Sequence, residues 1–106
     1  MQEKLIGFYS DPKHGHCLRR IRNVNTKIRI DGVYGDDEPN TGGYWYAYIK
    51  ILNSSSGYYN LEVDFTGKPI KKKKTLRAKW FPLERCIKWE DGNTWKKLYS
   101  SSQQIY

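Results

Sequence analysis

Apolar and polar residues alternate along most of this chain, and this pattern is typical of β-strands that turn one face to a core. In the segment Tyr44 to Leu52, for example, Trp45, Ala47 and Ile49 fall on one face, and tyrosines fill the positions between them. No stretch has the apolar spacing of a convincing helix. The pattern predicts about seven or eight strands, at Leu5 to Tyr9, Cys17 to Val24, Thr26 to Tyr34, Tyr44 to Leu52, Tyr58 to Phe65, Thr75 to Trp80, Arg85 to Trp89 and Trp95 to Tyr99.

The apolar face of these strands predicts the hydrophobic core, because residues at alternate positions share one face of a sheet. Lys27 and Arg29 are expected on the opposite, solvent-facing side of their strand. The residues expected to be buried are Ile28, Ile30, Trp45, Ala47, Ile49, Leu61, Val63, Phe65, Leu76, Ala78, Ile87 and Trp89.

The connections between the predicted strands carry turn residues. Asp91-Gly92, between Trp89 and Trp95, is a strong short-range hairpin signal, and Gly92 is expected at positive φ. The polar run 53–57 suits a longer hairpin loop. Short connections of this kind favour pairing between sequential strands, so the order predicts an antiparallel meander.

The predicted fold class is all-β. A chain without helices covers its apolar face with more sheet, and closing the sheet into a small barrel removes exposed edges. A two-sheet sandwich is the alternative. The length of 106 residues suits one domain, which we expect over residues 1–99, followed by a flexible C-terminal tail at residues 100–106.

Charge narrows the classes of partner. Lys and Arg outnumber Asp and Glu by 19 to 11, which gives a net charge of +8. This excess favours phosphate-rich or acidic partners, such as nucleic acid or an acidic protein surface. Aromatic residues make up 15% of the chain, too many for a disordered basic tail and suited to packing on a sheet.

Cysteine content and hydropathy predict the compartment. Cys17 and Cys86 are fewer cysteines than a disulfide-stapled secreted domain normally carries. The segment Met1 to Phe8 lacks the apolar run of a signal peptide, and no window approaches the roughly 18 apolar residues of a membrane span. We therefore expect an intracellular protein of the cytoplasm or nucleus, or a virion component, with no membrane partner and with reduced thiols. One disulfide between the two cysteines stays open as an alternative.

The basic segment that starts at Lys68 is the main candidate binding site. Its cations, on one loop and the outer face of the next strand, are Lys68, Lys71, Lys72, Lys73, Lys74, Arg77 and Lys79. Tyr46 and Tyr48 are the candidates for stacking on bases. Cations interleaved with rings suit phosphate contact plus base stacking, whereas a lysine-rich hairpin that only blocks aggregation is the equal alternative. A second basic cluster is Arg19, Arg20 and Arg22.

Two other motifs carry chemically reactive side chains. His14, His16 and Cys17 offer zinc ligands, but three ligands within four residues rarely converge on one ion. The acidic run from Gly32 to Pro39 is interpreted as a solvated loop, because adjacent acids point in different directions. The sequence has no phosphate-binding glycine loop, zinc-protease motif or serine elbow. We therefore expect no metal, no cofactor and no catalytic residues.

Four turn motifs follow one another along the chain: YSDPKHG, GVYGDDEP, VDFTGK and WEDGNTW. This ordered set resembles a family of small uncharacterised β domains associated with protists, algae and large DNA viruses, and the resemblance spans about Gly7 to Leu98. The resemblance implies that these turns matter to the fold or to a shared surface, and it carries over no activity or catalytic residue. The meander is also similar in outline to calycin-type barrels, which hold small ligands.

Three functions remain open at this point. The leading hypothesis is a non-enzymatic binding module whose basic, aromatic-rich surface binds nucleic acid or another polyanion. The second is a structural subunit of a virion or another large assembly, in which the same side chains contact other subunits. The third is a small-ligand-binding barrel. Salt separates the first two, because phosphate contacts weaken steeply with salt and apolar interfaces do not.

Overall fold

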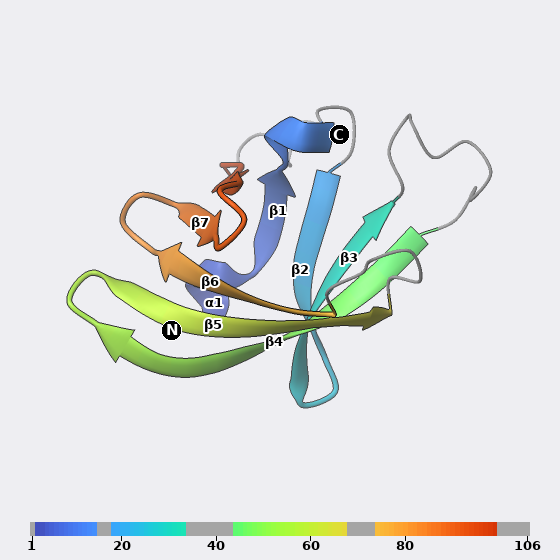
Figure 1. The fold of residues 1–106 in the computed structure, drawn as a ribbon, viewed down its shortest axis with the longest axis horizontal. Helices are drawn as coiled ribbons and strands as arrows, with labels where there is room; N and C mark the ends of the chain where they lie inside the picture. The colour runs from blue at the N-terminus through green and yellow to red at the C-terminus, as the bar shows by residue number, and fades with distance from the viewer. Residues whose placement is uncertain (1, 15–17, 34–43, 68–73, 100–106) are drawn as a thin grey trace.

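The computed structural model describes residues 2–14, 18–33, 44–67 and 74–99. It confirms the predicted class, because eight antiparallel strands form one closed barrel in sequence order and β1 pairs with β8. Figure 1 shows strands β1 to β7 arranged around one interior. The strands are β1 (Gly7–Ser10), β2 (Leu18–Val24), β3 (Lys27–Val33), β4 (Tyr44–Ser55), β5 (Tyr58–Gly67), β6 (Thr75–Phe81), β7 (Cys86–Trp89) and β8 (Thr94–Lys97). Two short helices flank β1, namely α1 (Gln2–Leu5) and the 3-10 helix η1 (Pro12–His14).

The core prediction is confirmed at all twelve positions, each of which has at most 7% of its surface exposed. Further core residues are Leu5, Tyr9, Ile21, Trp80 and Trp95. Aromatic rings dominate part of the interior: the centroids of Phe65 and Trp89 lie 5.7 Å apart, and those of Trp89 and Trp95 lie 4.8 Å apart. Burying one ring of phenylalanine size contributes about 1.5–3 kcal/mol, so these rings stabilise the core.

The N-terminal segment differs from its prediction. The alternation predicts a strand from Leu5, but Leu5 ends α1 and β1 begins at Gly7. The Leu5 side chain is nevertheless fully buried, and its carbonyl oxygen accepts a 2.7 Å hydrogen bond from the Tyr9 hydroxyl. The Lys97 ammonium donates to the Lys4 carbonyl at 2.7 Å, which ties α1 to β8. Neither helix in the described ranges is long and apolar enough to cross a membrane.

The hairpin between β7 and β8 turns as predicted. Gly92 has a φ of 92°, and its N–H donates to the Trp89 carbonyl at 3.0 Å. The Asn93 carbonyl accepts from the Trp89 N–H at 2.8 Å, which closes the turn. A side chain at position 92 would meet no atom within 4 Å, so glycine is required there for its conformation and not for space.

The hairpin between β4 and β5 is tighter than the polar run 53–57 predicts. β4 continues to Ser55, which pairs directly with Tyr58, and Gly57 turns the chain at a φ of 90°. The Asn60 amide donates to Asn53 Oδ1 at 2.7 Å across the two strands. Polar side chains therefore lie within the β4–β5 hairpin ladder, although the composition of residues 53–57 suggests a loop.

Candidate nucleic-acid interface

The cations of the predicted basic site fall into two sets. Lys68, Lys71, Lys72 and Lys73 lie outside the described residues, so their prediction stays a prediction. Lys74, Arg77 and Lys79 are described and exposed. In β6 the exposed Arg77 and Lys79 alternate with buried neighbours, so the strand pattern places both side chains on the outer face of the barrel.

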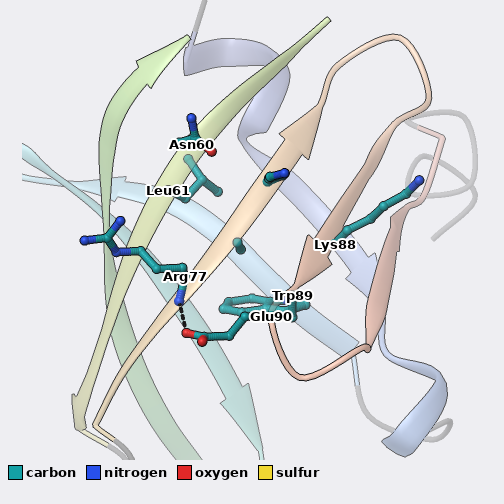
Figure 2. A pocket seen from close by; sticks show the side chains of 8 residues that line it. Asn60, Leu61, Arg77, Lys88, Trp89 and Glu90 are labelled. Carbon is teal, nitrogen blue, oxygen red and sulfur yellow. Dashed lines mark hydrogen bonds between the residues drawn. The ribbon is translucent and has the colours of Figure 1, made fainter. Parts of the chain in front are cut away.

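A groove of about 370 Å³ lies over β5, β6 and β7. The residues that line it include Asn60, Arg77, Lys79, Lys88, Trp89 and Glu90. Lys79 pairs with Asn60 on one side and with Lys88 on the other, so these three side chains form one row across the sheet. Figure 2 shows Arg77 and Lys88 on opposite sides of this space, with Glu90 between them and accepting a hydrogen bond from the Arg77 N–H. We refer to this surface as the cation groove.

Two cations of the groove have acidic neighbours that hold them only weakly. Arg77 Nη2 lies 3.3 Å from Glu62 Oε2, and these side chains are 62% and 35% exposed. Lys88 Nζ lies 3.7 Å from Glu84 Oε1, and both side chains are more than half exposed. Exposed pairs of this kind contribute about 0–1 kcal/mol, so both cations can exchange these partners for phosphate oxygens.

Aromatic rings position the two lysines of the groove. Lys79 Nζ lies 4.9 Å from the centre of the Tyr58 ring, and Lys88 Nζ lies 4.7 Å from the centre of the Phe81 ring. The two rings contact each other, with their centroids 5.3 Å apart. Since each ammonium rests on a ring face, the lysine stems are held over the sheet and the charges stay at its surface.

The two candidate stacking residues differ in their surroundings. The Tyr46 ring lies against Gly67, where an added Cβ would come within 2.5 Å of its carbons, and the Arg29 guanidinium lies 4.5 Å from its centre. Tyr46 is therefore committed to contacts within the sheet. Tyr48 is also half-buried, with Lys27 Nζ 5.0 Å from its ring centre and the Tyr46 ring 5.7 Å away, but it lines a pocket and is therefore the better candidate for stacking.

Acidic side chains of β5 lie between the described β6 cations, Arg77 and Lys79, and the predicted tyrosines. Tyr48 on β4 pairs with Asp64 on β5, and Glu62 on β5 pairs with Arg77 on β6. Two carboxylates of β5, Glu62 and Asp64, therefore lie between the tyrosines and the β6 cations. Strands β4 and β6 are two strand spacings, or about 10 Å, apart. The described cations of β6 and the two tyrosines therefore do not form one continuous surface, whereas the prediction for Lys68, Lys71, Lys72 and Lys73 stays a prediction.

The second basic cluster divides between the two faces of the barrel. Arg20 is exposed and Arg22 is partly exposed, but Arg19 is buried, with 1% of its surface exposed, so its assignment to a surface cluster is wrong. The reason is visible in the sequence: Arg19 and Ile21 share the inner face of β2, and alternation places the other two arginines outside.

Arg19 forms the one buried ion pair that the described residues contain. Its Nη2 lies 3.4 Å from Asp11 Oδ2, and Asp11 is also buried. The Asn93 amide donates to Asp11 Oδ1 at 2.9 Å, and the Lys13 N–H donates to the same oxygen at 3.0 Å. The Arg19 guanidinium also lies 5.1 Å from the centre of the Trp45 ring. The sequence marks Asp11 only as a turn residue, and no local pattern predicts its partner eight residues away.

A small cavity adjoins this buried pair. It measures about 110 Å³ and is lined by Asp11, Arg19, Trp45 and Trp95, among others. Pockets for small organic ligands usually measure about 300–1,000 Å³. The volume of this cavity therefore gives little support to the prediction of a small-ligand-binding barrel.

The candidate metal and redox residues form no recognisable site within the part of the chain that the structure describes. Among the residues that the structure describes, no group of three or more His, Cys, Asp or Glu side chains could hold a metal ion. His16 and Cys17, and the side chain of His14, lie outside the description. The Cys86 thiol is free and buried, and burial raises its pKa, with Glu84 adding to the rise, so it is a poor nucleophile.

The fold and its surface define a class: a small up-and-down β-barrel with an aromatic interior and a cation groove over β5 to β7. No family model matches the chain, and no match was found among curated proteins or solved structures. The resemblance of its turn motifs to small β domains of protists, algae and large DNA viruses stays an expectation.

Proposed function

We propose that this protein is a non-enzymatic binding module whose cation groove holds the phosphate backbone of nucleic acid. The observation that carries the proposal is the convergence of Arg77, Lys79 and Lys88 around one groove, with Glu90 as the acid that lines it among the described residues. Three exposed cations on two adjacent strands match a chain of phosphates better than an isolated anion. The net charge of +8 adds long-range attraction.

The chemistry of the groove favours binding that depends on charge and not on base sequence. Lysine ammonium groups attract phosphate as point charges and read no base edge. The aromatic residue in the lining, Trp89, has 6% of its surface exposed, so its ring is not available for stacking. We therefore expect sequence-tolerant binding that weakens steeply with salt, because each neutralised phosphate releases condensed counterions.

A second candidate function, a subunit of a virion or other large assembly, is favoured by a different observation. Leu83 is 90% exposed in the turn between β6 and β7, and Tyr99 is 65% exposed after β8. Exposed apolar side chains of this size suit a protein interface. Binding through them would persist at high salt, so the salt dependence of partner capture separates the two functions.

The test is a titration of a labelled single-stranded oligonucleotide at several salt concentrations. The groove variant Lys79→Ala/Lys88→Ala removes two charges from β6 and β7. Its matched control, Arg20→Ala/Arg22→Ala, removes two charges from β2, which lies four strands from β6 and three from β7 around the barrel. We expect the groove variant to lose affinity and to lower the salt slope by about two, or one per lost phosphate contact.

Each outcome of this titration is decisive. If the wild-type protein does not bind at low salt, the nucleic-acid proposal is wrong, and the assembly function takes its place. If the control pair loses affinity and the groove pair does not, the binding surface lies on β2. Thermal melting of both variants checks that they fold, which we expect because all four side chains lie on the outer face of the barrel.

A further inference from the structure

A second pocket lies beside Tyr48, on strands β3 to β6, and measures about 520 Å³. Its charged and polar lining includes Lys27, Lys50, Glu62, Asp64 and Thr75. Tyr48 and Asp64 are direct cross-strand partners, so their side chains leave the same face of the sheet next to each other. A ring and a carboxylate are thus adjacent in a space larger than a single base.

Asp64 is chemically distinct from the other acid of this pocket. Glu62 is paired with Arg77 at 3.3 Å, whereas no ion pair to Asp64 exists within the described residues. Asp64 Oδ1 accepts a 2.9 Å hydrogen bond from the Thr66 N–H, which leaves Oδ2 able to accept from a ligand. An exposed carboxylate oxygen next to an aromatic ring is suited to a flat ligand that carries an amino group.

The cations around the pocket make it compatible with a phosphodiester. Lys27 Nζ lies 5.0 Å from the centre of the Tyr48 ring, and Lys50 lines the same space. The lining balances two lysines against Glu62 and Asp64, so it carries no net negative charge that would repel a phosphate. A strand can therefore place a base on the ring while its phosphates contact the lysines.

We propose that this pocket binds one unpaired base of a nucleic-acid strand and prefers bases with an exocyclic amino group, namely cytosine, adenine and guanine. This inference rests on the proposed function. The base stacks on Tyr48, and its amino group donates to Asp64 Oδ2, as carboxylates do with the cytosine amino group elsewhere. Thymine and uracil have no exocyclic amino group, and at the position of the cytosine amino group they carry a carbonyl oxygen, which repels the carboxylate. In a duplex both faces of each base are already stacked on neighbouring bases, so single strands are preferred.

The test compares oligodeoxycytidine and oligothymidine of equal length by fluorescence anisotropy at fixed salt. We expect the wild-type protein to bind the cytidine strand about tenfold more tightly, the discrimination typical of one hydrogen bond to a charged group. Asp64→Asn should abolish the preference, because an amide both donates and accepts. Glu62→Gln, which removes the same charge from the adjacent carboxylate, should keep it.

Tyr48→Ala should weaken binding of both strands about tenfold by removing the stacking platform, and Tyr48→Leu should do the same while filling more of the space. Melting curves establish that the variants fold. Equal affinity of the wild-type protein for both strands, or a preference that survives Asp64→Asn, would overturn the base pocket and leave the proposed function intact. Absence of binding to either strand would instead overturn the proposed function.

Discussion

Arg19 and Arg20 are neighbours in the chain and lie in opposite environments. Arg19 points into the barrel, where it is 1% exposed and paired with Asp11. Arg20 points outward, is exposed and lies over the Phe8 ring, with its guanidinium carbon 5.6 Å from the ring centre. The alternation of side chains along a strand places the two arginines on opposite faces. An arginine on the inner face therefore contributes to stability, and an arginine on the outer face is available for binding.

The two faces also treat charge differently. Inside, Arg19 is surrounded by tryptophan rings and needs its carboxylate partner, since an unpaired buried charge costs several kcal/mol. Outside, water and salt screen the charges, so the exposed pairs hold little energy and exchange readily for a ligand. Changes on the inner face should therefore alter stability without altering binding, and changes on the outer face should alter stability much less.

The largest expected effect comes from breaking the inner pair. Asp11→Ala leaves the buried Arg19 without its carboxylate and should lower the free energy of unfolding by about 3–5 kcal/mol. The matched change on the outer face is Asp31→Ala, which removes the carboxylate that Arg22 and Arg29 share at 2.6 and 2.9 Å. That change should cost about 1 kcal/mol. Urea denaturation measures both, and equal losses for the two variants would contradict the distinction.

The hairpin at Gly92 is the next most sensitive position. Gly92→Val should cost about 1 kcal/mol or more, because a β-branched residue resists the φ of 92° found there. Gly92→Asn should cost less, since asparagine adopts positive φ more readily than valine. Melting temperatures of the two variants measure this, and an unchanged value for the valine variant would contradict the turn assignment. Nucleic-acid affinity should not change in either variant.

Tyr9 gives the inner face a dependence on alkaline pH. Burial raises the pKa of Tyr9 well above its ordinary value of 10.0, so the folded protein keeps a proton that the unfolded chain releases. The stability that this provides is complete below pH 10 and is lost as pH rises above it. Tyr9→Phe removes the hydrogen bond to Leu5, should cost about 1 kcal/mol at neutral pH, and should make the alkaline loss shallower.

Urea denaturation at neutral and at alkaline pH tests this prediction. Tyr99, which is 65% exposed, provides the control. Tyr99→Phe should leave the free energy of unfolding unchanged at both neutral and alkaline pH. A variant at position 9 that loses stability above pH 10 as steeply as the wild-type protein would contradict the role of Tyr9.

Alternation in the sequence was sufficient to predict the barrel, its strand order and its core, because each inner face is almost purely apolar. The exceptions are two charged residues that are buried inside the barrel. Asp11 and Arg19 can both be buried because they form an ion pair with each other. A period-two pattern does not show that two charged side chains will be in contact. α1 was not predicted because a single helical turn gives no periodic signal.

The candidate site was only partly predictable for a similar reason. Arg77 and Lys79 were assigned correctly to the outer face of one strand. Lys88 joins them only through the pairing of β6 with β7, and Asp64 meets Tyr48 only through the pairing of β4 with β5. Register between strands determines which outward side chains become neighbours, and no single strand contains that information.

The measurement that tests the central claim most directly is residue-resolved NMR mapping of the folded protein during titration with a single-stranded oligonucleotide. We expect the largest chemical-shift changes at Arg77, Lys79 and Lys88, and we expect these changes to reverse when salt is added. The chemical shifts of Arg19 and Asp11 should not change. Absence of shifts at low salt would contradict the central claim. So would shifts concentrated at residues of the inner face or at Arg20 and Arg22.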